Sequence, residues 1–112
     1  MEESILLSIK KLLGLDKSYT VFDPDIIIHI NSVFMILNQL GVGPEKGFRI
    51  EDDIAVWHDY ITDEDNLDAV KTYIYLKVKL IFDPPLNSAV MNAYKESINE
   101  FEWRANLQAE SK

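Results

Sequence analysis

The residues with the most evident potential for chemistry are two histidines and a run of carboxylates. His29 lies in an apolar segment, where a histidine usually serves the core or a subunit contact. His58 follows a tryptophan in an acidic stretch, but the spacing around it matches no known metal site. The run Asp-Glu-Asp-Asn at 63–66 resembles the start of a calcium loop without the glycine and the closing glutamate that such a loop requires. We therefore predict no metal site.

The glycine-rich segment 41–47 contains a lysine, but it does not predict a phosphate site. A phosphate loop places Gly-Lys-Ser/Thr between a strand and a helix, whereas here the lysine precedes the last glycine and a helix comes first. No serine lies in the context of a nucleophile elbow, and the chain has no cysteine. The paired carboxylates lie in a stretch that predicts no pocket, so nothing would separate their pKa values. We expect no catalysis and no cofactor.

The composition is typical of one folded domain. The chain has 112 residues, of which 47% are hydrophobic, and that is enough to form a core. Its first residues are acidic where a signal peptide would be basic, and its apolar runs are too short to span a membrane. We therefore expect a single domain over residues 1–112 that is soluble and not exported, and the absence of cysteine suits a protein made in a reducing cytoplasm.

The net charge of −8 comes from one stretch, residues 51–68, which holds eight acidic residues and no lysine or arginine. The other 11 acidic residues are balanced by 11 basic ones. Such a stretch would repel a phosphate backbone, so sequence-specific DNA binding is not expected. The stretch is either a solvated loop that maintains solubility or a surface with a function of its own.

Hydrophobic periodicity predicts two helices in the first half of the chain. The first covers residues 2–13, has acids at its start and lysines at its end, and is stopped by Gly14. The second begins at Asp23-Pro24, a favourable start for a helix, and ends near Leu40. Apolar residues surround nearly the whole circumference of this second helix, so we expect it to be central and buried.

Two more helices are predicted in the second half. The third begins at Thr62 or Asp65 and ends at Phe82, because the two prolines that follow cannot continue a helix. The fourth begins at Asn87 or Ser88 and runs to about residue 108. Between the second and third helices, segments 48–50 and 54–57 suggest a short β-hairpin or an irregular insertion. The expected fold is therefore mainly α, a four-helix bundle-like domain with this insertion.

The fourth predicted helix has two faces. At about 100° per residue, one sector is apolar and should pack on the core; its members are Val90, Met91, Tyr94, Ile98, Phe101 and Ala105. The opposite half is polar except for Trp103 and Leu107, which are four residues apart and adjacent on the helix surface. Either these two side chains are exposed or covered by a loop of their own chain, or they contact another subunit or partner.

Several runs of residues match one known family in their order and pattern. The most specific run is 67–85, a helix that ends in Phe-Asp-Pro-Pro and is followed by an amphipathic helix with a late Trp-Arg pair. Further matching runs are 4–14, 22–27, 30–34 and 37–43. Together, over almost the whole chain, they resemble the small head–tail connector (head-completion adaptor) proteins of tailed bacteriophages and prophages. None of these runs is a catalytic motif.

The resemblance implies a structural protein of the virion neck, made in the host bacterial cytoplasm. Such a protein assembles as a homo-oligomeric ring below the portal, extends the DNA channel and offers a platform to the next neck or tail-completion protein. DNA passes through without sequence-specific binding. Family members contact the portal through their C-terminal region, which implies a portal or subunit interface at Trp103, Arg104 and Leu107.

A ring would give the acidic stretch a physical role. The stretch is repeated around the ring axis, so carboxylates that face the channel would repel the phosphates of passing DNA. The residues predicted to face the channel are Glu51, Asp52, Asp53, Asp63, Glu64 and Asp65.

Two other classes of function remain open from the residues alone. An acidic inhibitor that mimics DNA would use the local charge run, although mimics usually spread acidic residues over a whole face. A small regulatory subunit of a host enzyme would use an exposed Trp103. A connector should form rings alone or on a portal, whereas a mimic should remain small and bind a DNA-handling protein.

Overall fold

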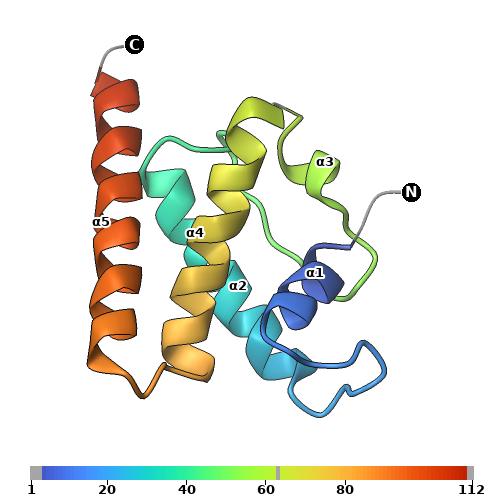
Figure 1. Cartoon of the computed structure of the whole chain (residues 1–112). Helices are drawn as coiled ribbons and strands as arrows, with labels where there is room; N and C mark the ends of the chain where they lie inside the picture. Colours follow the sequence, from blue (N-terminus) through green and yellow to red (C-terminus); the bar gives the residue numbers. More distant parts are fainter. Residues whose placement is uncertain (1–3, 63, 111–112) are drawn as a thin grey trace.

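A computed structural model describes residues 4–62 and 64–110, with the side chains of residues 64, 65 and 108–110 outside the description. Figure 1 shows a mainly helical molecule, which confirms the predicted fold class. The described residues form five helices: α1 (Ile5–Leu12), α2 (Asp23–Gln39), α3 (Trp57–Tyr60), α4 (Glu64–Phe82) and α5 (Ser88–Glu110). Four of them correspond to the four predicted helices, and the short α3 is additional.

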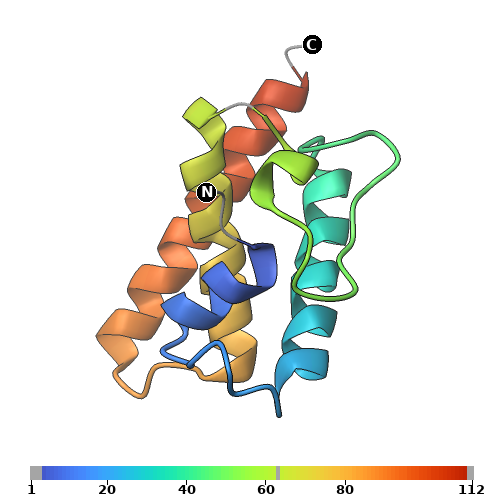
Figure 2. The ribbon, with the colours of Figure 1, turned by 90° about the vertical axis from the view of Figure 1, so that its right-hand side faces the viewer.

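The core lies where α2 packs on α4, with α1 against α2 and α5 along another side of α4 (Figures 1 and 2). It includes fully buried side chains from α1, α2 and α4, among them Ile5, Ile9, Ile26, Ile30, Phe34, Tyr73, Ile74 and Val78. The predicted main stripe of α2 is buried as expected. However, Ile28 and Met35 are 61% and 60% exposed, so the expectation that α2 is buried nearly all round is wrong.

The predicted β-hairpin is wrong, and no strand is present among residues 4–62 and 64–110. The Ile50 N–H donates to Asn31 Oδ1 at 2.8 Å, and the Ile50 carbonyl accepts from Asn31 Nδ2 at 2.9 Å. On the other segment, the Ile5 N–H donates to the Ala55 carbonyl at 2.9 Å. The two segments therefore bind α2 and α1 rather than each other. These hydrogen bonds satisfy backbone N–H and C=O groups that would be paired between two strands in a hairpin.

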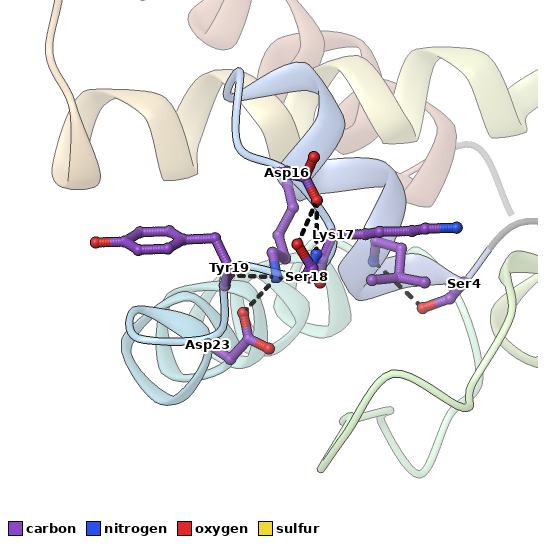
Figure 3. Close-up of polar contacts among 8 residues, drawn as sticks. Ser4, Asp16, Lys17, Ser18, Tyr19 and Asp23 are labelled. Atoms are coloured by element: carbon purple, nitrogen blue, oxygen red, sulfur yellow. Dashed lines mark hydrogen bonds and ion pairs between the residues drawn. The ribbon is translucent and has the colours of Figure 1, made fainter.

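A buried lysine joins the end of α1 to the start of α2. Lys10 is fully buried, and its ammonium donates to the carbonyls of Lys17 at 3.1 Å and Tyr19 at 2.8 Å. The same nitrogen forms an ion pair with Asp23 Oδ1 at 2.8 Å (Figure 3). A buried charge is tolerated only with such partners. The loop 13–22 is therefore wrapped around this ammonium.

Trp57 attaches α3 to α1. Its side chain is 2% exposed, and its indole N–H donates to Ser8 Oγ at 2.8 Å. The Ser8 hydroxyl in turn donates to the Ile5 carbonyl at 3.0 Å. One turn of helix begins at Trp57 because the Asp59 carboxylate accepts from the Val56 N–H at 3.0 Å, which is one of the two hydrogen bonds of a capping box.

An aromatic cluster holds the segment 41–60 against α2. The ring centroids of Phe34 and Tyr60 are 4.6 Å apart, and Phe48 lies 5.2 Å from each of them. Gly43 has a φ of +86°, and a Cβ there would lie 2.6 Å from a carbon of the Tyr60 ring, so only glycine fits. The Tyr60 hydroxyl is buried without a hydrogen-bond partner in the described part of the chain, and burial raises its pKa.

We expect Trp57→Phe to lower the free energy of unfolding by about 1–3 kcal/mol, because the smaller ring leaves a cavity in the core and Ser8 loses its indole partner. Ser8→Ala should cost a similar amount, and the double variant should cost less than the sum of the two, since both remove one hydrogen bond. Urea unfolding followed by circular dichroism measures all three. Strictly additive effects would show that the bond contributes nothing to stability.

Tyr60→Phe should be neutral or stabilising by up to about 1 kcal/mol at neutral pH, because it removes a buried hydroxyl that lacks a partner. The raised pKa means that the folded state resists ionisation of this phenol, whereas the unfolded chain ionises near pH 10. Stability should therefore be intact below about pH 10 and fall above it, and the fall should be smaller in the variant. Melting temperatures at pH 7 and pH 11 test this, and a destabilised variant at pH 7 would contradict it.

Candidate interaction surfaces

The helix α5 is held mainly by α4, along one side (Figure 1). Ile98 and Ala105 are buried in this seam at 6% and 7% exposure. The Phe101 ring stacks on the Tyr73 ring, with centroids 4.4 Å apart and planes 20° from parallel. Val90, predicted on the same inner face, is 39% exposed. The seam is thus formed chiefly by the second half of α5.

A polar contact fixes the rotation of α5 about its own axis. The Tyr73 hydroxyl donates to Glu102 Oε2 at 2.6 Å, and Lys77 Nζ lies 3.8 Å from the same oxygen. Burial, and then the hydrogen bond to the negative Glu102, raise the pKa of the Tyr73 hydroxyl, so it stays a donor at neutral pH. Because Glu102 points toward α4, the opposite side of α5 faces outward.

The outer face of α5 carries the predicted interface residues. Trp103 is 63% exposed and Leu107 is 45% exposed, so no loop of the described chain covers them. Arg104 is also exposed and forms an ion pair with Glu100 at 2.6 Å. The three side chains lie on one helix, but Arg104 is turned toward a neighbouring groove. The structure therefore presents two large, exposed apolar side chains on one helix.

A groove of about 700 Å³ lies beside this face. The turn at 41–44, α3, α4 and the second half of α5 each contribute to its lining, which includes Tyr60, Phe101 and Arg104. Sequence reasoning did not find it, because these segments are far apart in the chain and no motif links them. Its mixed polar and apolar lining suits a contact with another chain.

A second groove, the α2 groove, lies between α2 and the segment 46–49 and has a volume of about 590 Å³. The exposed Ile28 and Met35 lie on the α2 side, and Phe34 and Phe48 contribute apolar surface. Two cations, Lys46 and Arg49, also line it, and its lining contains no carboxylate. The sequence signal for this groove is the apolar residues around nearly all of α2, a pattern that predicts burial but that the rest of the fold leaves partly uncovered.

The structure describes only part of the predicted acidic surface. Glu51, Asp52 and Asp53 are exposed in a bend between Ile50, which is bound to α2, and residue 55, which is bound to α1. Asp63 lies outside the described residues. Glu64 and Asp65 begin α4, and their side chains lie outside the description. The structure therefore shows one exposed acidic bend, and the placement of all six carboxylates in a channel stays a prediction.

The histidines and the glycine-rich segment, which were considered for chemistry above, lie on or next to helices α2 and α3. His29 is half-buried on α2, and His58 is exposed on α3. The glycine-rich segment begins with the end of α2, where Gly41 has a φ of +83° and the Val42 N–H donates to the Leu37 carbonyl at 2.9 Å, as in a Schellman motif.

Within residues 4–62 and 64–110, no three histidine or acidic side chains are grouped as metal ligands. None of the described helices is both long and apolar enough to cross a membrane.

Comparison with known proteins gives one result. A family model described as "Phage connector protein" matches residues 5–112, which is almost the whole chain. No curated protein and no solved structure gives a significant match.

Proposed function

Since this chain belongs to the phage connector protein family, we propose that it forms a ring below the portal, extends the DNA channel and joins the head to the tail. A structural role at the head–tail junction of a phage follows from the family itself. For this chain we propose, in addition, the ring, the portal contact and the passage of DNA through the ring.

The observation that carries the proposal is the outer face of α5. A tryptophan and a leucine in water forgo a few kcal/mol of possible burial. Here they lie on a helix whose rotation is fixed by Tyr73 and Glu102, so they cannot turn inward without breaking that contact. Tryptophan and arginine are enriched where partners bind most strongly. We therefore assign Trp103, Arg104 and Leu107 to the contact with the portal or a neighbouring subunit.

A connector requires several surfaces for partners, and the described residues provide more than one candidate. The outer face of α5, the groove beside it and the α2 groove open on different parts of the molecule. One subunit of a ring needs two different surfaces for its two neighbours and a further one for each neck component. Separate surfaces on the described part of the chain therefore suit a subunit that sits between several partners.

The exposed acidic bend at 51–53 supports a role for charge in the channel. A ring brings one bend from each subunit around its axis, and carboxylates in that position would repel phosphates and keep DNA from adhering. We propose that Asp63, Glu64 and Asp65 add to the same negative lining.

The ring and the portal contact are tested by native mass spectrometry of the full chain, alone and mixed with the portal protein. We expect rings alone or on the portal. Trp103→Ala with Leu107→Ala should raise the concentration needed for assembly by about tenfold or more. Leu86→Ala is the matched control, because Leu86 is fully exposed but lies in the turn before α5. A chain that stays monomeric with every portal preparation, or that binds a DNA-handling protein instead, would overturn the proposal.

The channel lining is tested by neutralising all six carboxylates to Asn or Gln: Glu51, Asp52, Asp53, Asp63, Glu64 and Asp65. We expect assembled rings to bind duplex DNA more tightly at low salt, and genome passage to slow, because the repulsion is lost. Asp25→Asn with Glu45→Gln, both at exposed positions elsewhere, should leave DNA binding unchanged. Normal genome passage through the neutralised ring would count against a channel role.

A further inference from the structure

We propose that the outer face of α5 of one copy docks into the α2 groove of the next copy, and that this contact is what closes the ring. This inference rests on the proposed function, and it names the surface of the neighbouring copy that receives the outer face of α5. The receiving surface is apolar and basic: Ile28 and Met35 are exposed by 61% and 60%, and Lys46 and Arg49 stand beside them.

The docking surface is apolar and acidic. At 100° per residue, Glu96, Glu100, Trp103 and Leu107 fall within a sector of about 60° on α5. All four are exposed, and they lie opposite Ile98 and Ala105, which are buried against α4. Two carboxylates thus precede two large apolar side chains along one strip. Glu100 is paired with Arg104 at the edge of the strip, so Glu96 is the carboxylate with no ion pair shown in the described residues.

Charge selects this pairing over the alternatives. Two α5 strips face to face would bring carboxylates together, and two α2 grooves would bring Lys46 and Arg49 against their own copies. Like charges in a contact are costly, whereas the strip and the groove offer opposite charges and apolar side chains to each other. The favoured contact therefore joins two different surfaces, which makes it heterologous, and a heterologous contact generates rings when its rotation closes.

The fold allows each copy to use both surfaces at once. Ile28 and Met35 lie about 180° around α2 from residues that are buried in the core, such as Ile26 and Leu37. The helix α5 packs along a different side of α4 (Figures 1 and 2). The groove and the strip therefore face away from the shared helix in different directions, so one copy can offer its strip to one neighbour and its groove to another.

Charge reversal on the full chain tests the contact. The groove variant carries Lys46→Glu and Arg49→Glu, and the strip variant carries Glu96→Lys and Glu100→Lys. Each alone should raise the concentration for ring assembly by at least about tenfold in native mass spectrometry. An equal mixture of the two variants should recover most of the assembly, because wherever the two variants alternate around the ring each groove meets a strip of opposite charge. Lys11→Glu with Lys17→Glu makes the same change in net charge as the groove variant, at exposed positions away from both surfaces, and should assemble normally.

The outcomes separate this inference from the proposed function. If the groove variant assembles like the wild type while the strip variant fails on the portal, the strip binds the portal and the inference is wrong, although the connector role stands. If both variants weaken assembly but their mixture does not recover, the two surfaces do not meet and the inference is again wrong. If the wild type forms no ring either alone or on the portal, the proposed function itself is wrong.

Discussion

The seam between α4 and α5 determines which side of α5 is exposed. Tyr73 links the core to the last helix, because its ring is 1% exposed, stacks on Phe101 and carries the hydroxyl that binds Glu102. A helix in water gains little stability from its own backbone hydrogen bonds. The position of α5 must therefore be fixed by its packing against α4. By fixing which side of α5 faces inward, the seam also determines that Trp103 and Leu107 face outward.

The irregular half of the molecule is held by polar side chains that reach out of helices. Lys10 gathers the loop 13–22, Asn31 binds both backbone groups of Ile50, and Ser8 accepts from Trp57. Each of these contacts joins residues between 7 and 49 positions apart. They satisfy buried donors and acceptors where no regular ladder exists, and an unsatisfied group there would cost about 1–3 kcal/mol. The segment 41–60 is therefore ordered without a sheet.

This difference explains which parts of the fold could be predicted. Helix ends at Gly14, Gly41 and Phe82 follow from local chemistry, and all fell within about two residues of the expected position. The β-hairpin was wrong because 48–50 and 54–57 have strand-like residues but find partners in Asn31 and Ile5, which no local pattern encodes. Periodicity placed Trp103 and Leu107 on the polar side of a helix, and both are exposed. It could not show that Ile28 and Met35 lie uncovered, because an apolar circumference does not reveal how much of it the rest of the fold covers.

The net charge of −8 constrains how copies of this chain can meet. Copies of one strongly acidic chain repel each other at long range, which opposes association, but salt limits that repulsion to about 8 Å under physiological conditions. Within that distance, the charges on the contacting surfaces determine whether two copies attract or repel each other. The α2 groove differs from the acidic molecule as a whole, because its lining has two cations and no carboxylate. A contact of this kind is weak between free copies and strengthens when a template holds several of them side by side, because the effective concentration then rises. Under the proposed function that template is the portal, so the charge pattern would favour ring assembly on the capsid over premature assembly in the cytoplasm.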